Sequence, residues 1–103
     1  MIGVYTPDLM DRSKIAAAAP DAHFVTKPEA LVGLAGIGLA VVDLRQPGVL
    51  DVLAEIAASV PVIAYGSHVD RERLAAAEAA GCRAVLPRSA FFSRLEELLT
   101  ATD

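Results

Sequence analysis

The chain alternates between two kinds of segment, and the alternation occurs five times. Short runs rich in β-branched residues are each followed by a window in which Ala and Leu recur at helical spacing. Strands that alternate with helical windows indicate βα units and a parallel sheet. A length of 103 residues leaves room for one domain with one core. We therefore expect residues 1–103 to form a single α/β domain.

The predicted strands are residues 2–5, 22–25, 39–42, 62–65 and 84–86. The third of them is apolar throughout, which is typical of a central parallel strand buried on both faces. The predicted helices follow the strands: one from Pro7 to Pro20, one over residues 28–35, and three that begin at Val49, at Arg71 and after Ser89.

Helix N-caps are predicted from residues whose side-chain oxygen can accept a backbone N–H bond. Thr6, Asp70 and Ser89 stand at such positions, and Pro7 would follow Thr6 at the first helical position. Thr26 and Glu29 have the spacing of a capping box.

Right-handed crossovers between these strands give an open parallel sheet with helices on both faces. The simplest closure is a flavodoxin-like three-layer sandwich with strand order 2-1-3-4-5. In such sheets the site lies beyond the carboxyl ends of the strands, near the switch between strands 1 and 3. The segments to consider are residues 6–8, 43–48, 66–68 and 87–89.

Charge and composition exclude several classes of function. Nine basic and thirteen acidic side chains give a net charge of −4 with no long basic block, so direct nucleic-acid binding is not expected. The uncharged apolar stretch at residues 30–42 is shorter than the roughly 20 apolar residues that span a bilayer, so no membrane association is expected.

The lone Cys82 can form neither an internal disulfide nor a cysteine-based zinc site. With no signal-peptide pattern before Arg12, we expect a cytoplasmic protein. Seven Arg against two Lys, together with abundant Ala, suggest a bacterial source.

Asp43 is the residue most indicative of a site, because it follows four apolar strand residues directly. Its carboxylate should face the crevice at the switch point, where it could act as a nucleophile or a metal ligand. An Asp in this position also commonly caps the loop that follows. The spacing leaves both interpretations open.

Three segments carry a resemblance to a known family: residues 39–48 (LAVVDLRQPG), 61–67 (PVIAYGS) and 81–89 (GCRAVLPRS). Their order and spacing resemble the response-regulator receiver domain of two-component signalling, over most of residues 1–103. The resemblance implies that Asp43 is the phosphoacceptor position, and Pro47 and Gly48 match the family's Pro-Gly. Phosphoryl transfer to a carboxylate also requires Mg²⁺ and a cation that holds the phosphoryl group.

The acidic and hydroxyl positions depart from the family's pattern. The family has two adjacent acids after strand 1, whereas this chain has Thr6, Pro7 and Asp8, so Asp8 would supply one acid and form the metal site with Asp43. The hydroxyl position after strand 4 falls at Gly66, and Ser67 beside it would bind the phosphoryl group.

The positions on and after strand 5 depart as well. The lysine that follows strand 5 in the family falls nearest Arg88, which preserves the charge but not the shape. The family's aromatic switch position falls at Val85. The resemblance therefore implies a degenerate pseudo-receiver.

Three functions follow from this interpretation. The first is a non-enzymatic signalling module that binds a protein partner or a second copy without normal phosphorylation. The second is an active phosphoacceptor that uses Asp43, Mg²⁺ at Asp8 and Asp43, and phosphate contacts from Ser67 and Arg88. The third is a small-molecule-binding α/β domain of unrelated chemistry.

The surface that the resemblance implies for a partner comprises the helix from Arg71, the strand at residues 84–86 and the helix from Ser89. Its charged side chains would be Arg71, Glu72, Arg73, Glu78, Arg83, Arg94 and Glu97.

Overall fold

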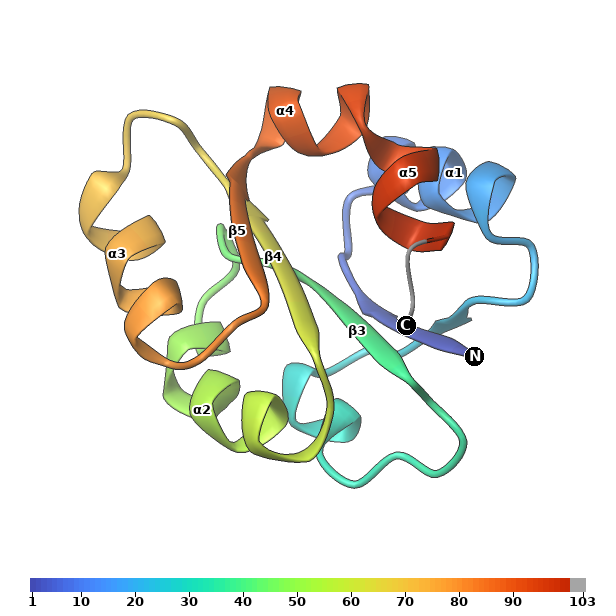
Figure 1. The fold of residues 1–103 in the computed structure, drawn as a ribbon, viewed down its shortest axis with the longest axis horizontal. Coiled ribbons are helices and arrows are strands. Elements are labelled where there is room, and N and C mark those ends of the chain that lie inside the picture. Colours follow the sequence, from blue (N-terminus) through green and yellow to red (C-terminus); the bar gives the residue numbers. More distant parts are fainter. Residues whose placement is uncertain (101–103) are drawn as a thin grey trace.

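The computed structural model describes residues 1–100. In it the chain forms a three-layer sandwich around one parallel sheet (Figure 1). The strand order is β2-β1-β3-β4-β5, as the sequence predicts. The strands are β1 (Ile2–Tyr5), β2 (His23–Phe24), β3 (Leu39–Asp43), β4 (Val62–Gly66) and β5 (Ala84–Pro87).

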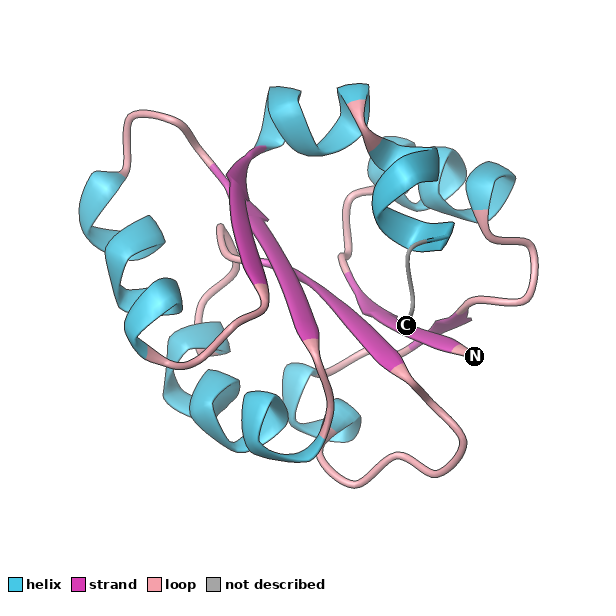
Figure 2. Cartoon of the chain, viewed as in Figure 1, coloured by secondary structure: helices cyan, strands magenta, loops and turns pink. Residues whose placement is uncertain are grey.

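Helices cover both faces of the sheet (Figure 2). One face is covered by α1 (Leu9–Ala18), α4 (Arg88–Ser93) and α5 (Leu95–Thr100). The other is covered by the short 3₁₀ helix η1 (Pro28–Leu31), α2 (Val49–Ser59) and α3 (Arg71–Ala79). Among residues 1–100, no helix combines the length and the apolar character that crossing a membrane requires.

The central strand β3 supplies side chains to both layers of the core. Leu39 and Val41 pack with the α1 and α4 side, whereas Ala40 and Val42 pack with the α2 side. All four are fully buried, because successive side chains of a strand point to opposite faces of the sheet. Asp43 is the last residue of this apolar strand, and it lies where the neighbouring strands also have their carboxyl ends.

The starts of two helices differ from the prediction. Asp8, not Thr6, caps α1, and its carboxylate accepts the backbone N–H groups of Met10 and Asp11. Thr6 is buried at the end of β1, where its hydroxyl bonds to side chains of the core. Ser89 lies inside α4, which starts directly after Pro87.

The second predicted helix is only one 3₁₀ turn, and its capping box is not formed. The residue before it is Lys27, with no side-chain cap, and the backbone of Gly33 turns to a φ of 69°. That conformation favours glycine and ends a helix. The predicted last helix is also divided, because Arg94 leaves the helical conformation between α4 and α5.

Candidate functional site

The carboxyl ends of β1, β3 and β4 lie side by side around the buried acid Asp43. Its neighbour in the β4 register is Tyr65, and Thr6 follows β1 beside them. Asp43, Thr6 and Tyr65 are all buried. The apolar strands thus carry three polar side chains to one edge of the sheet, as the topology of an open parallel sheet requires.

The Asp43 carboxylate is occupied mainly by Arg45, two residues along the chain. The backbone N–H of Arg45 donates to Oδ1 at 2.9 Å, Nε donates to the same oxygen at 3.0 Å, and Nη2 donates to Oδ2 at 2.9 Å. Weaker bonds to Oδ2 come from Gln46 Nε2 at 3.4 Å and Thr6 Oγ1 at 3.5 Å. Asp43 therefore both caps its loop and holds a two-pronged ion pair.

A second buried carboxylate, that of Asp11, completes the cluster. It lies in the first turn of α1 and has no solvent exposure. Arg45 Nη2 donates to its Oδ2 at 2.8 Å, and Arg88 binds it through Nη2 and through Nε, the latter at 3.3 Å. One guanidinium nitrogen thus bridges Asp11 and Asp43, which come from separate elements of the fold.

Sequence reasoning missed both Asp11 and Arg45. Asp11, Ile15 and Ala18 are spaced as i, i+4 and i+7, so they share one face of a helix. An acid on the face that also carries the buried Ile15 was the signal that could have found Asp11. The role of Arg45 depends on how its loop turns back over the strand ends, and no spacing rule specifies that turn.

The two carboxylates and two guanidiniums cancel in charge. The pKa of Arg45 is raised well above its ordinary value, mainly because its side chain donates to Asp43, and that of Arg88 is raised by its hydrogen bond to Asp11. Both arginines therefore stay charged at any ordinary pH. Their side chains are about one third exposed, so they lie between the buried acids and the solvent.

Tyr65 connects the acidic cluster to the aromatic core. Its hydroxyl lies 2.8 Å from Thr6 Oγ1 and donates to Asp11 Oδ2 at 3.0 Å. Its ring stacks on Phe91 of α4 with centroids 4.6 Å apart. Burial is the main reason that the pKa of Tyr65 is raised, so the hydroxyl remains protonated as a donor.

The predicted site residues fall in two groups. Arg88 joins the cluster through Asp11, and Asp43 lies at its centre. Asp8 and Ser67 make local bonds: Asp8 caps α1, and Ser67 accepts the N–H of Val69 at 3.4 Å. The pKa of Asp8 is lowered chiefly by the backbone N–H of Asp11, with smaller contributions from the charges of Arg45 and Arg88.

The cluster as arranged does not fit a divalent cation. Across residues 1–100, no three His, Cys, Asp or Glu side chains are grouped so that they could hold a metal ion. In the same part of the chain, every buried side-chain nitrogen or oxygen has a hydrogen-bond partner. The oxygens of Asp43 that a cation would need already accept bonds from Arg45.

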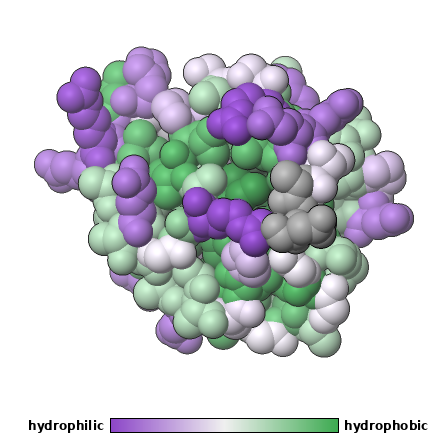
Figure 3. All heavy atoms as spheres, in the orientation of Figure 1, coloured by the Kyte–Doolittle hydropathy of each residue, from purple (hydrophilic) through white to green (hydrophobic). Residues whose placement is uncertain are grey.

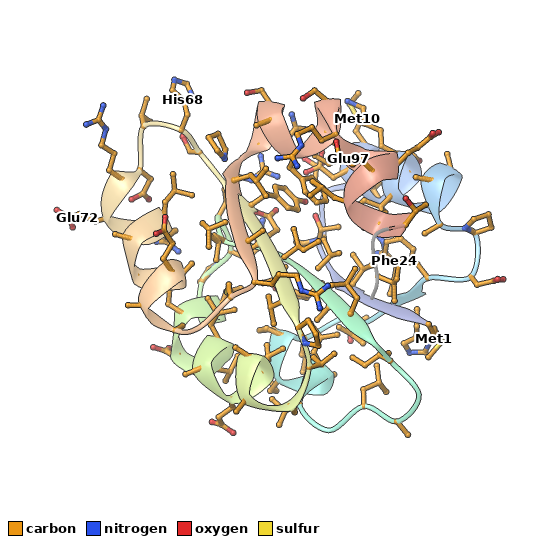
Figure 4. All side chains as sticks on the ribbon, viewed as in Figure 1. Met1, Met10, Phe24, His68, Glu72 and Glu97 are labelled. Carbon is orange, nitrogen blue, oxygen red and sulfur yellow. The ribbon has the colours of Figure 1, made fainter. Side chains whose placement is uncertain are left out.

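A separate groove of about 620 Å³ lies between α1 and the α4 and α5 segments. Lys14 and Ala18 form its α1 side, and Phe92 and Leu95 lie on the other side. In Figure 4, Met10 and Glu97 lie on the α1 and α5 side of the molecule, whereas His68 and Glu72 lie on the α3 side. Among residues 1–100, none that lines the groove belongs to the carboxylate cluster, so the groove is a separate feature of the outer helical surface.

Comparison with known proteins identifies the fold. No family model matches the sequence, and no curated protein matches it. Among solved structures, a response regulator from Hahella chejuensis has a TM-score of 0.80 and 19% identity, over 96% of this chain and 91% of that one. A CheY-like response regulator from Mesorhizobium loti has a TM-score of 0.74 and 18% identity, over 99% of this chain and 97% of that one.

A third similar structure was solved with a metal ion. The Mn²⁺-bound form of response regulator Rcp1 has a TM-score of 0.75 and 15% identity, over 97% of this chain and 91% of that one. Together these likenesses show that the chain has the fold of response-regulator receiver domains.

Proposed function

From the receiver fold as a premise, we propose that this chain is a signalling domain that acts by binding another protein, without Mg²⁺-dependent phosphorylation of Asp43. The fold supports a role in signalling, and the cluster around Asp43 supports independence from phosphorylation. In this proposal the carboxylate cluster stabilises the domain instead of carrying chemistry.

The single observation that carries the proposal is the two-pronged bond between Arg45 and Asp43. A carboxylate attacks phosphorus through a free lone pair, and a metal ion must neutralise the phosphoryl oxygens during transfer. Both oxygens of Asp43 accept guanidinium hydrogen bonds of 2.9–3.0 Å in length. Phosphorylation would first have to break a guanidinium bond to a fully buried carboxylate, which is unfavourable.

The surface that we propose for the partner comprises α3, β5 and α4, and is called the α3–β5–α4 face below. In Figure 3 apolar residues gather around the middle of this face, with hydrophilic residues around them. Arg71, Glu72 and Arg83 are exposed there, and Val85 on the edge strand β5 is half-buried. Mixed charge around an apolar centre is typical of a surface that binds another protein.

Three charged residues expected on this face, Arg73, Arg94 and Glu97, are instead held within the chain. Arg73 bonds to Asp70 and to the Leu44 carbonyl, and Arg94 pairs with Glu97. We therefore assign the specificity of binding to the exposed residues that remain, Arg71, Glu72, Glu78 and Arg83.

An active phosphoacceptor is the second candidate, because Asp43 stands at the carboxyl end of β3 and Arg88 lies in the same cluster. The two candidates differ in a direct assay. We would incubate the chain with acetyl phosphate and millimolar Mg²⁺ and measure its intact mass. The proposal predicts no phosphoryl adduct, whereas an adduct lost in Asp43→Asn would establish the second candidate.

The partner surface is tested by placing a photo-crosslinking amino acid at Arg83 in cells that express the chain. A matched probe at His23, exposed on the opposite edge strand β2, serves as the control. Crosslinks to a protein from position 83 but not from position 23 support the α3–β5–α4 face. Crosslinks from position 23 alone would place the partner elsewhere.

A further inference from the structure

We infer that the guanidinium of Arg45 occupies the place of a divalent cation between Asp11 and Asp43, and that removing it converts the pair into a metal site. This inference rests on the proposed function and explains how the two buried carboxylates are neutralised without a metal ion. It concerns one residue that sequence reasoning assigned only to a loop.

The geometry around one nitrogen carries the inference. Nη2 of Arg45 lies 2.8 Å from Oδ2 of Asp11 and 2.9 Å from Oδ2 of Asp43. One nitrogen of a delocalised cation therefore bridges carboxylates from α1 and from the end of β3. A hard divalent cation bridges carboxylate oxygens in the same way, at shorter distances.

Hydroxyl oxygens lie close to the two carboxylate oxygens that this nitrogen bridges. The Thr6 hydroxyl lies 3.5 Å from Asp43 Oδ2, and the Tyr65 hydroxyl lies 3.0 Å from Asp11 Oδ2. Carboxylate and other oxygen ligands are those that Mg²⁺ and Mn²⁺ prefer. The chemistry around the bridging position thus suits a hard cation once the guanidinium is gone.

Charge balance gives the driving force. With Arg45 present, two carboxylates face two guanidiniums and the cluster has no net charge. Without the Arg45 guanidinium, Asp11 and Asp43 face Arg88 alone, which leaves one uncompensated negative charge among buried atoms. Such a charge is unfavourable unless it is paired or binds a metal ion.

The two acids should keep their positions when the Arg45 side chain is shortened. Asp11 is also held by Arg88 and Tyr65, and Asp43 also accepts the backbone N–H of residue 45. The Arg45 side chain is one third exposed and lies between the two acids and the solvent, so its removal opens a path from solvent.

The test compares Mn²⁺ binding, measured by electron paramagnetic resonance of free Mn²⁺, in the wild type, Arg45→Met and Arg94→Met. Arg94→Met is the matched control, because Arg94 forms an exposed ion pair with Glu97 on α5. We expect Arg45→Met to bind one Mn²⁺ with a Kd below roughly 1 mM, within the range of weak oxygen-ligand sites. The wild type and Arg94→Met should bind at least tenfold more weakly.

Mn²⁺ should also raise the Tm of Arg45→Met, because it binds the folded state, and adding Asp11→Asn should abolish both the binding and this rise. Absence of Mn²⁺ binding by folded Arg45→Met, or equally tight binding by the wild type, would overturn the inference. If Arg45→Met does not fold without metal, its refolding on Mn²⁺ addition, followed by circular dichroism, gives the same answer, and Arg45→Gln provides a second variant.

The proposed function fails on a separate result, the appearance of a phosphoryl adduct on the wild type. That assay uses the natural chain, and the Mn²⁺ assay depends on the variant. The two failures can therefore be told apart.

Discussion

Arg45 and Asp43, two residues apart, face each other in parallel: Nε donates to Oδ1 at 3.0 Å and Nη2 donates to Oδ2 at 2.9 Å. The same Nη2 atom reaches Asp11, 34 positions away along the chain. The fork thereby ties the end of β3 to the first turn of α1. A bidentate pair of this kind fixes direction as well as charge.

Asp43→Asn should lower the free energy of unfolding by about 2–3 kcal/mol. The amide cannot balance the guanidinium, and breaking a buried pair costs about 3–5 kcal/mol, a value we reduce because Arg45 is one third exposed. Urea denaturation followed by circular dichroism measures the change. The matched control, Asp21→Asn at an exposed turn, should leave the midpoint unchanged. Equal effects of the two substitutions would contradict a structural role for the fork.

Asp11 and Arg88 should show strong energetic coupling although they are 77 positions apart. A double-mutant cycle with Asp11→Ala and Arg88→Ala should give a coupling of about 1–3 kcal/mol, because a partly buried pair is poorly screened. The same cycle on the exposed pair Arg94 and Glu97 should give no measurable coupling. Additive effects at Asp11 and Arg88 would count against the cluster.

Tyr65 should make the domain less stable in alkali. Its pKa is raised in the folded chain by burial, whereas in the unfolded chain it is about 10. Only the unfolded chain can then release the proton, so stability is retained below pH 10 and falls as the pH rises above it. Urea midpoints measured from pH 8 upward should fall less steeply in Tyr65→Phe than in the wild type. Identical slopes would mean that the hydroxyl ionises freely in the folded chain.

Loss of the Tyr65 hydroxyl should also reduce stability by about 1–2 kcal/mol at neutral pH, since Asp11 and Thr6 lose a partner. Burial also raises the pKa of the Cys82 thiol, so Cys82 too lowers the stability of the chain as the pH rises. The pH comparison for Tyr65 is therefore best made in a Cys82→Ala background.

Cys82 should react slowly with alkylating reagents. Burial raises the pKa of its thiol from the ordinary 9.0 to about 11, and only the thiolate is a strong nucleophile. The rate of iodoacetamide labelling in the folded chain should therefore have its midpoint near pH 11, and in urea near pH 9. The contribution of the half-buried thiol to stability is present below pH 9 and is lost as the pH rises toward 11. A folded-state midpoint near pH 9 would contradict this burial.

The fold could be predicted because its signals are local. The apolar run at residues 39–42 indicates a central strand. The cap at Asp70 and the helix that begins at Val49 lie where the sequence predicts them. Asp43 could be placed at the site for the same reason, since the strand ends at it. The one-turn helix η1 could not, because it depends on the backbone turn at Gly33.

The remainder of the site depends on register and loop shape. A helix that starts at Pro7 makes Asp8 the acid of the first turn, whereas the observed start at Leu9 makes Asp8 the cap and turns Asp11 inward. A shift of two residues in the start of the helix therefore changes which carboxylate lies close enough to Asp43 to share Arg45 with it. Arg45 reaches both acids only because its loop folds back, a tertiary effect without a signal in the spacing.

The most direct test of the account is an NMR titration of the wild-type chain with Mg²⁺ and then with beryllofluoride, which mimics a phosphorylated carboxylate. The account predicts that the amide signals of Asp43, Arg45 and Asp11 stay in place at millimolar Mg²⁺ and after beryllofluoride is added. Saturable shifts at these residues that vanish in Asp43→Asn would show that the cation and the phosphoryl mimic displace Arg45, and would contradict it.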